Sequence, residues 1–203
     1  MVTNRRLRSS TIPDADKHFT PSWATHSLLQ KEKFHGLIWE PSCGDGWMSN
    51  IIKSYGYRVR SSDIDQDNEY GASGIDFLES HFQVANIITN PPYSILNKFM
   101  EHGVQLSRRK FCLLIRLAAL ATKGRWLNIY KDQPPSRIWV FVERITMYPY
   151  GIKTGGSGTT EYAWFVWSKE EPDYGKPLST KIGWIEPGHR VRYSNSNKQH
   201  PLY

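Results

Sequence analysis

The sequence predicts a three-layer α/β domain built on a mostly parallel sheet. Strand-like and helix-like segments alternate between about residues 36 and 168, which is the pattern of parallel strands joined by helices. The most apolar run, residues 111–117, is typical of a strand covered on both faces. The 203 residues of the chain are enough for one such domain.

Each strand has its own local signal. Residues 36–40 form a short apolar run that ends in an acid, and residues 57–62 alternate with the period of a strand. The other strands are expected at residues 84–89, 111–117, 138–145 and 162–167, and a third strand tip is expected at Asp76.

The helices are predicted from apolar residues at helical spacing. Met48, Ile51, Ile52 and Tyr55 form one such stripe, and Gly56 follows where a C-cap glycine belongs. A second stripe runs from residue 95 to 104, and a short helix is expected at residues 126–130.

Both ends of the chain are basic. We expect a basic N-terminal arm over residues 1–16, the folded domain over residues 17–170, and a loop-like basic C-terminal extension over residues 171–203. Four prolines and a Ser-Asn repeat interrupt the extension.

The composition excludes several classes of protein. The chain has no apolar run long enough for a membrane span. No apolar segment follows its basic N-terminus, so we do not expect that stretch to be a secretory signal. The two cysteines, Cys43 and Cys112, are not expected to form a disulfide scaffold or a four-ligand zinc site. The net charge of +7 favours a polyanionic partner.

A glycine turn follows the first strand. Gly44 and Gly46 lie between a strand and a helix, where the missing Cβ atoms let the backbone approach a ligand. Position 49, the third glycine of a dinucleotide fingerprint, is Ser49. Asp63 at the next strand tip is placed to accept hydrogen bonds from ribose hydroxyls, and the Asp76-Phe77 pair is placed to hold an adenine ring.

The second motif is Asn90-Pro91-Pro92-Tyr93, directly after the strand at 84–89. Two prolines end a strand and fix the backbone as a rigid turn. Ligands of open α/β sheets bind at the carboxyl edge of the strands, where this turn lies. The motif is therefore interpreted as the catalytic segment.

Together the two motifs resemble class I S-adenosylmethionine-dependent methyltransferases, and most closely the small phage and prophage DNA adenine-N6 methyltransferases. The resemblance covers about residues 17–168. It implies a Rossmann-like, seven-stranded α/β fold, S-adenosylmethionine as cofactor and DNA as the nucleic-acid partner. It also implies a monomer or homodimer without metal or membrane partner, in the cytoplasm of a bacterial or phage-infected cell.

The resemblance assigns roles to particular residues. Asn90, Pro91, Pro92 and Tyr93 are the catalytic residues it implies. The cofactor-binding residues it implies are Phe19, Thr20, Glu40, Pro41, Ser42, Cys43, Gly44, Gly46, Asp63, Ile64, Asp76, Phe77 and Asn90. Cys43 is expected to pack in the glycine turn and not to act as a nucleophile.

The tetrapeptide offers hydrogen-bond acceptors that a planar amino group, such as that of adenine, could use. Acceptors at the Asn90 side chain and the Pro91 carbonyl would draw the nitrogen toward tetrahedral geometry, so that its lone pair faces the methyl donor. The target base must be flipped out or single-stranded, and Tyr93 would stack on it. Predicted nucleic-acid contacts are Arg116, Lys123, Arg125 and Lys153.

Few residues follow the last predicted strand, so we expect short or relaxed sequence specificity. Four alternatives stay open. An RNA adenine target needs the same chemistry, and cytosine-N4 methylation is closely similar. Protein glutamine methylation normally needs a helical domain for which the first 35 or so residues are too few. A non-catalytic nucleic-acid-binding protein would not need an intact tetrapeptide.

Overall fold

The structure is a computed structural model that describes residues 18–149 and 160–193. The predicted N-terminal arm and the predicted contact Lys153 lie outside the described residues. Within the described ranges, no helix is long and apolar enough to cross a membrane.

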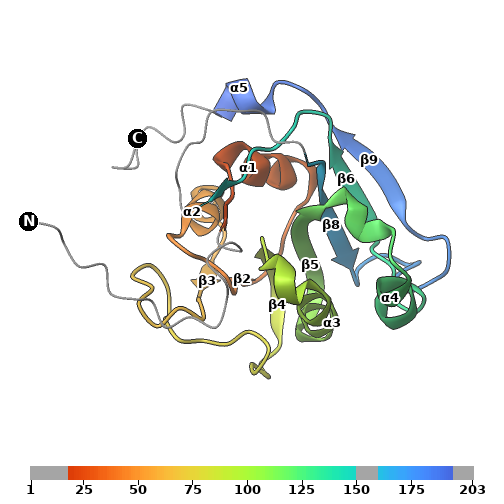
Figure 1. Cartoon of the computed structure of the whole chain (residues 1–203), viewed down its shortest axis with the longest axis horizontal. Coiled ribbons are helices and arrows are strands. Elements are labelled where there is room, and N and C mark those ends of the chain that lie inside the picture. Colours follow the sequence, from red (N-terminus) through yellow and green to blue (C-terminus); the bar gives the residue numbers. More distant parts are fainter. Residues whose placement is uncertain (1–17, 150–159, 194–203) are drawn as a thin grey trace, which may run out of the picture.

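A seven-stranded mixed sheet forms the centre of the molecule (Figure 1). Its order is β3-β2-β4-β5-β8-β6-β9, and β8 runs antiparallel to both of its neighbours while every other pair is parallel. The strands are β2 (Ile38–Glu40), β3 (Val59–Ser61), β4 (Val84–Thr89), β5 (Ser107–Arg116), β6 (Arg137–Phe141), β8 (Tyr162–Ser168) and β9 (Lys181–Ile185). A separate two-stranded sheet pairs β1 (His18–Phe19) with β7 (Tyr148–Pro149).

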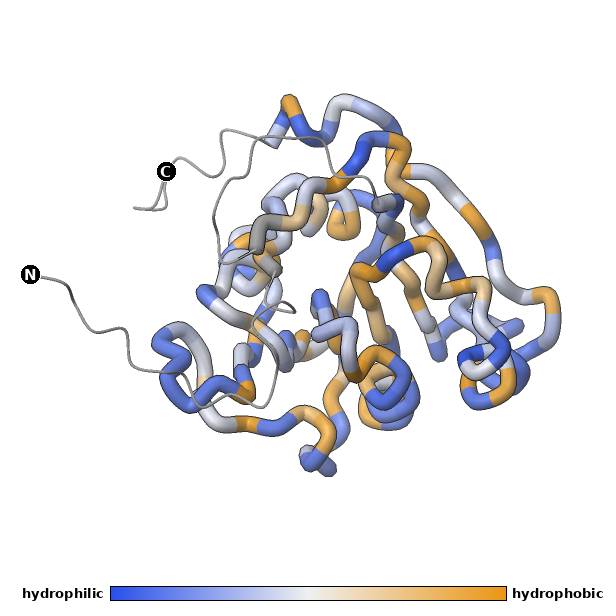
Figure 2. The backbone as a smooth tube through the Cα atoms, in the orientation of Figure 1, coloured by the Kyte–Doolittle hydropathy of each residue, from blue (hydrophilic) through white to orange (hydrophobic). Residues whose placement is uncertain are grey.

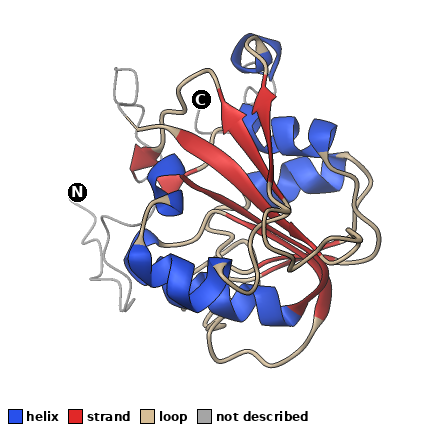
Figure 3. Cartoon of the chain, turned by 90° about the vertical axis from the view of Figure 1, so that its right-hand side faces the viewer, coloured by secondary structure: helices blue, strands red, loops and turns tan. Residues whose placement is uncertain are grey.

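Helices cover both faces of the sheet, which confirms the three predicted layers (Figure 3). The helical segments are α1 (Ser22–Lys31), α2 (Trp47–Ser54), η2 (Tyr93–Ile95), α3 (Leu96–Leu106), η3 (Leu117–Leu120), α4 (Lys123–Arg125), η4 (Trp126–Tyr130) and α5 (His189–Tyr193). One core cluster joins α1 and α2 to the sheet through Trp23, Ile52 and Trp164. A second joins α3 and η4 to the opposite face through Phe99, Ile129 and Phe165.

The strands at the middle of the sheet are buried on both faces. Ile87 and Ile88 on β4 and Leu113 and Leu114 on β5 have no exposed surface, which explains their continuous apolar sequence. Figure 2 shows hydrophobic residues along the central strands and hydrophilic ones in the loop after β3. The carboxyl ends of β2, β4 and β5 therefore meet at one edge, where the predicted motifs lie.

The seventh strand is not where the sequence led us to expect it. No strand ends at Asp76, because residues 62–83 form turns with a single bridge between Ser62 and Ala72. Residues 181–185, expected to be loop, form the edge strand β9 beside β6. Gly183 weakens the strand signal, but a Cβ there would lie 2.3 Å from the Trp139 ring.

Candidate active site

The glycine turn has the backbone geometry that only glycine adopts easily. Gly44 and Gly46 lie between β2 and α2 with positive φ angles of 49° and 81°. A Cβ atom on Gly46 would also come within 2.3 Å of the Tyr70 ring. Gly46 is therefore required both by its own conformation and by the segment that packs on it.

The segment after β3 holds the glycine turn in place. The Asp63 carboxylate accepts hydrogen bonds from the backbone N–H of Gly44 at 2.9 Å and of Asp65 at 3.0 Å. Asn68 donates from its side chain to the Gly44 carbonyl at 2.7 Å, and its oxygen accepts from Gly71 at 2.9 Å. Sequence reasoning missed Asn68, although an Asn three residues after Asp65 is a common turn signal.

A pocket opens beside the glycine turn, at the carboxyl ends of β2 and β4. It is lined by seven of the predicted cofactor residues, namely Phe19, Thr20, Glu40, Ser42, Cys43, Gly44 and Asn90. The structure thus brings together residues from the start of the domain, from the glycine turn and from the predicted catalytic segment.

Three further lining residues were not predicted: Asp45, Trp47 and Met48. Trp47 begins α2, and its ring lies 5.6 Å from that of Phe19, centroid to centroid, at an angle of 55°. No sequence pattern links these two aromatics, because β1 and α2 come together only in the folded chain.

Other predicted cofactor residues lie outside this pocket. They are Pro41, Gly46, Asp63, Ile64, Asp76 and Phe77. We expected Phe77 to cover an adenine ring, but its side chain lies in the core. It is 2% exposed and stacks on Phe99 at 4.2 Å between ring centroids. Phe77 is a core residue because an apolar ring gains more from burial than from solvent contact.

Glu40 is a buried acid on the pocket wall. Its side chain is 2% exposed, and its carboxylate accepts a hydrogen bond from Ser49. Burial raises the pKa of Glu40 to about 8, against the opposing effect of the Ser49 hydrogen bond. Ser49 also lies 2.6 Å from the Ser61 hydroxyl, so the position that lacks the third glycine carries a bridging hydroxyl.

The predicted catalytic segment reaches the pocket through Asn90, which is one of the lining residues. Pro91 and Pro92 are buried and Tyr93 is half-buried. The Tyr93 hydroxyl donates to the Asn90 side-chain oxygen at 3.2 Å. Asn90 therefore faces the glycine turn on one side and Tyr93 on the other.

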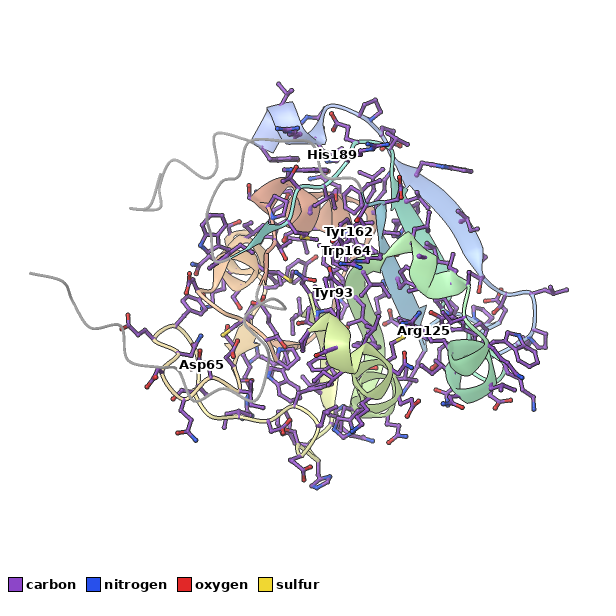
Figure 4. All side chains as sticks on the ribbon, viewed as in Figure 1. Asp65, Tyr93, Arg125, Tyr162, Trp164 and His189 are labelled. Carbon is purple, nitrogen blue, oxygen red and sulfur yellow. The ribbon has the colours of Figure 1, made fainter. Side chains whose placement is uncertain are left out.

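Two side chains from other strands surround Tyr93. The guanidinium carbon of Arg116, at the end of β5, lies 5.0 Å from the centre of the Tyr93 ring. The ring of Tyr162, at the start of β8, is 6.4 Å away and tilted by 40°. Figure 4 shows Tyr93 and Tyr162 close together near the centre of the molecule.

Cys43 has the environment of a packing residue. Burial raises the pKa of its thiol far above the ordinary value, so the thiol stays protonated. A Cβ atom on Gly71 would lie 2.8 Å from the Cys43 sulfur. This close packing supports the prediction that Cys43 is not a nucleophile.

The predicted nucleic-acid contacts differ in their surroundings. Arg116 and Lys123 are exposed. Arg125 instead donates to Asn97 at 2.9 Å and to the Ala119 carbonyl at 3.3 Å. These bonds give Arg125 a structural role in joining α4 to the start of α3.

Neither a protein-family model nor a curated protein sequence matches the chain, but solved structures share its fold. A Listeria monocytogenes protein assigned to the class I S-adenosylmethionine-dependent methyltransferases superposes with a TM-score of 0.58, at 14% identity, over 89% of this chain and 71% of that one. A modification subunit assigned to a type I restriction enzyme of Vibrio vulnificus gives 0.51 at 12% identity, over 91% of this chain and 54% of that one. A protein of Pyrococcus horikoshii assigned as an RNA methyltransferase gives 0.52 at 12% identity, over 80% and 93%.

These similarities, together with the strand order, define the fold. The chain has the fold of class I S-adenosylmethionine-dependent methyltransferases. The predicted seven-stranded, mostly parallel architecture is confirmed, with β9 in place of the expected third strand.

Proposed function

We propose that the protein is an S-adenosylmethionine-dependent methyltransferase that methylates the N6 amino group of adenine in DNA, with short or relaxed sequence specificity. One observation carries the proposal: the side chain of Asn90 lines the pocket at the glycine turn and also accepts the Tyr93 hydroxyl. The segment Asn90-Pro91-Pro92-Tyr93 is thus next to the place where a methyl donor would lie.

The pocket residues fit a cationic cofactor. Glu40 and Asp45 contribute carboxyl groups, and a bound cation would favour the ionised form of Glu40. Phe19 and Trp47 contribute aromatic rings, which attract a sulfonium or ammonium group. The backbone of the glycine turn allows close approach of the ligand. Bound there, S-adenosylmethionine supplies an electrophilic methyl group.

Asn90 and Pro91 would orient the target amino group. The Asn90 oxygen has two lone pairs, so it can accept an amino hydrogen while it keeps the Tyr93 hydroxyl. The Pro91 carbonyl accepts the second hydrogen in a direction that the buried diproline turn fixes. The nitrogen lone pair then points at the methyl group, and positioning accounts for the catalysis.

Tyr93 would hold the flipped base by stacking. The Arg116 guanidinium already lies over one face of this ring, so the base would stack on the opposite face. The charge of Arg116 suits the phosphate of the same nucleotide. Arg116 and Lys123 are accordingly proposed as backbone contacts.

The RNA alternative keeps specific support. The Pyrococcus protein is assigned as an RNA methyltransferase, whereas the Vibrio protein is a modification subunit assigned to a type I restriction enzyme. Because flipped adenines look alike in both polymers apart from the 2′-hydroxyl, the substrate assay must include both.

The test is methyl transfer from labelled S-adenosylmethionine to duplex DNA, single-stranded DNA, RNA and protein, followed by digestion to identify the modified base. We expect N6-methyladenine from DNA. Asn90→Ala should lower kcat by about 100-fold or more, as removal of one transition-state hydrogen bond does. Gln105→Ala, an exposed amide on α3, is the matched control.

If the label appeared in methylcytosine, in methylated glutamine or only in RNA, the proposed substrate would be wrong. Full activity of Asn90→Ala would overturn the proposed role of Asn90.

A further inference from the structure

An exposed aromatic surface lies beside the catalytic edge, on the segment that follows β5. We call residues 117–131 the post-β5 segment. Trp126 is 54% exposed, Leu127 is 47% exposed and Leu120 is 36% exposed. A large exposed aromatic with apolar neighbours is typical of a binding surface.

The post-β5 segment is held firmly in place, so Trp126 does not project from a loose loop. Ile129 is buried in the second core cluster, and the Tyr130 hydroxyl donates to the Ala119 carbonyl at 3.1 Å. Burial raises the pKa of Tyr130 to about 12, so this donor stays protonated.

A π-helical turn sets the direction of Trp126. The backbone N–H of Lys131 donates to the Trp126 carbonyl at 2.9 Å, five residues back, and η4 is a π-helix. Such turns occur often at functional sites. Here the turn buries Ile129 while the neighbours Trp126 and Leu127 both face solvent.

The same segment is next to the catalytic tetrapeptide. Arg125 bonds to Asn97 in the first turn of α3, four residues after Tyr93. Arg116, directly before the segment, lies over the Tyr93 ring. Figure 1 shows α4 alongside α3, and Figure 4 shows Arg125 on the side of Tyr93 away from α2.

The charge of the segment identifies the partner. It contains Lys123, Arg125 and Lys131 and no Asp or Glu. None of the three forms an ion pair with a described residue, whereas Lys31, Lys110 and Lys181 do. Cations without a described ion pair, next to an exposed aromatic ring, suit a ligand that has both negative charges and aromatic faces. A nucleic-acid strand has both, in its phosphates and its bases.

We propose that Trp126, supported by Leu127, stacks on a base that flanks the target adenine in the DNA strand. The inference rests on the proposed function, because it takes Tyr93 to hold the target base. Trp126 would bind the neighbouring nucleotide while Lys123 and Lys131 contact phosphates. The contact compensates for the stacking that the flanking base loses when its neighbour is flipped out.

The test measures the affinity of labelled single-stranded DNA that contains one adenine. Trp126→Ala should bind about tenfold more weakly, the usual effect of removing one base–aromatic stack. Trp126→Phe keeps a ring and should bind nearly as well as the wild type. Trp184→Ala is the matched control, because Trp184 is 59% exposed but lies on β9.

Abasic sites placed one at a time on either side of the adenine identify the stacked base. One abasic position should weaken the wild type about tenfold and leave Trp126→Ala unchanged. A structural defect in Trp126→Ala would not depend on that position. Equal affinity of Trp126→Ala and wild type on every strand would overturn the inference, as would binding to RNA alone.

The two proposals fail separately. If the wild type methylates no polymer, the proposed function fails while the binding measurements stand. If DNA is methylated but Trp126→Ala has wild-type Kd and KM, only the stacking contact is wrong.

Discussion

At the scale of single residues, the buried acid Glu40 connects the chemistry of the pocket to pH. A carboxyl group that is 2% exposed and has a pKa of about 8 is mostly protonated at neutral pH. A cationic ligand in the same pocket favours the ionised form. Cofactor binding should therefore release a proton from Glu40.

The expected result is that affinity for S-adenosylmethionine rises with pH. Only the ionised fraction of Glu40 is competent to pair with the cation, so affinity should increase up to about tenfold between about pH 7 and about pH 9. Titration calorimetry in buffers of different ionisation enthalpy measures both the affinity and the proton released.

Glu40→Gln is the control for this prediction. The ligand's own amino group titrates in the same range, so the difference between wild type and variant reports Glu40. Identical pH profiles for the two proteins would show that Glu40 does not ionise on binding.

At the scale of elements, a buried ion cluster joins the end of α1 to the sheet, at the edge opposite the pocket. The Glu32 carboxylate is 3% exposed and accepts hydrogen bonds from Lys110 on β5 at 2.8 Å. It also accepts from Arg137 at 2.5 Å and Trp139 at 3.0 Å, both on β6. Burial alone would raise the pKa of Glu32, but the bonds from Arg137 and Lys110 lower it by more.

We predict that Glu32→Gln lowers the free energy of unfolding by up to about 3–5 kcal/mol, because it removes the buried counter-charge that Lys110 and Arg137 share. The two cations then keep only the more exposed carboxylates of Glu170 and Glu171. Urea unfolding measures the change. In the wild type this stabilisation is complete above the unfolded-state pKa of the carboxyl group and is lost as pH falls through its lower folded-state pKa.

Glu186→Gln removes a comparable but exposed pair, since Glu186 bonds to Lys31 at 2.8 Å with its side chain 66% exposed. Its effect should be much smaller. Similar losses in the two variants would mean that burial does not strengthen the Glu32 cluster.

At the scale of the whole molecule, the charges that make up the net charge of +7 are unevenly distributed over the described residues. Lys123 and Arg125 on α4 have no described ion-pair partners, and Arg125 bonds to Asn97 in the first turn of α3, close to the pocket edge of the sheet. Cations at the opposite edge are partly neutralised, as Arg109 pairs with Glu170 and Lys181 with Glu171. The charge distribution of the described residues thus favours approach of a polyanion to the pocket edge of the sheet.

This asymmetry predicts that the effect of removing a cation on the salt dependence of DNA binding differs between the two edges of the sheet. Lys123→Gln should reduce the slope of log Kobs against log salt by about one phosphate contact, weakening all sequences alike. Lys181→Gln, at the opposite edge, should leave the slope unchanged. Binding isotherms at several salt concentrations decide, and equal slopes for wild type and Lys123→Gln would contradict the prediction.

The sequence by itself determined the positions of the glycine turn and the diproline turn. Both are set by local backbone restrictions: Gly44 and Gly46 adopt positive φ, and Pro91 and Pro92 end β4. The burial of residues 111–115 on β5 was likewise predictable from their apolar run. These features need no information from distant residues.

Only the tertiary structure decided which side chains meet. Trp47 faces Phe19 in the pocket, Tyr70 covers Gly46, and Phe77 turns into the core. Residues 181–185 join the sheet because β6 offers an edge. Such contacts depend on segments far apart in sequence, and local propensity does not encode the packing that selects them.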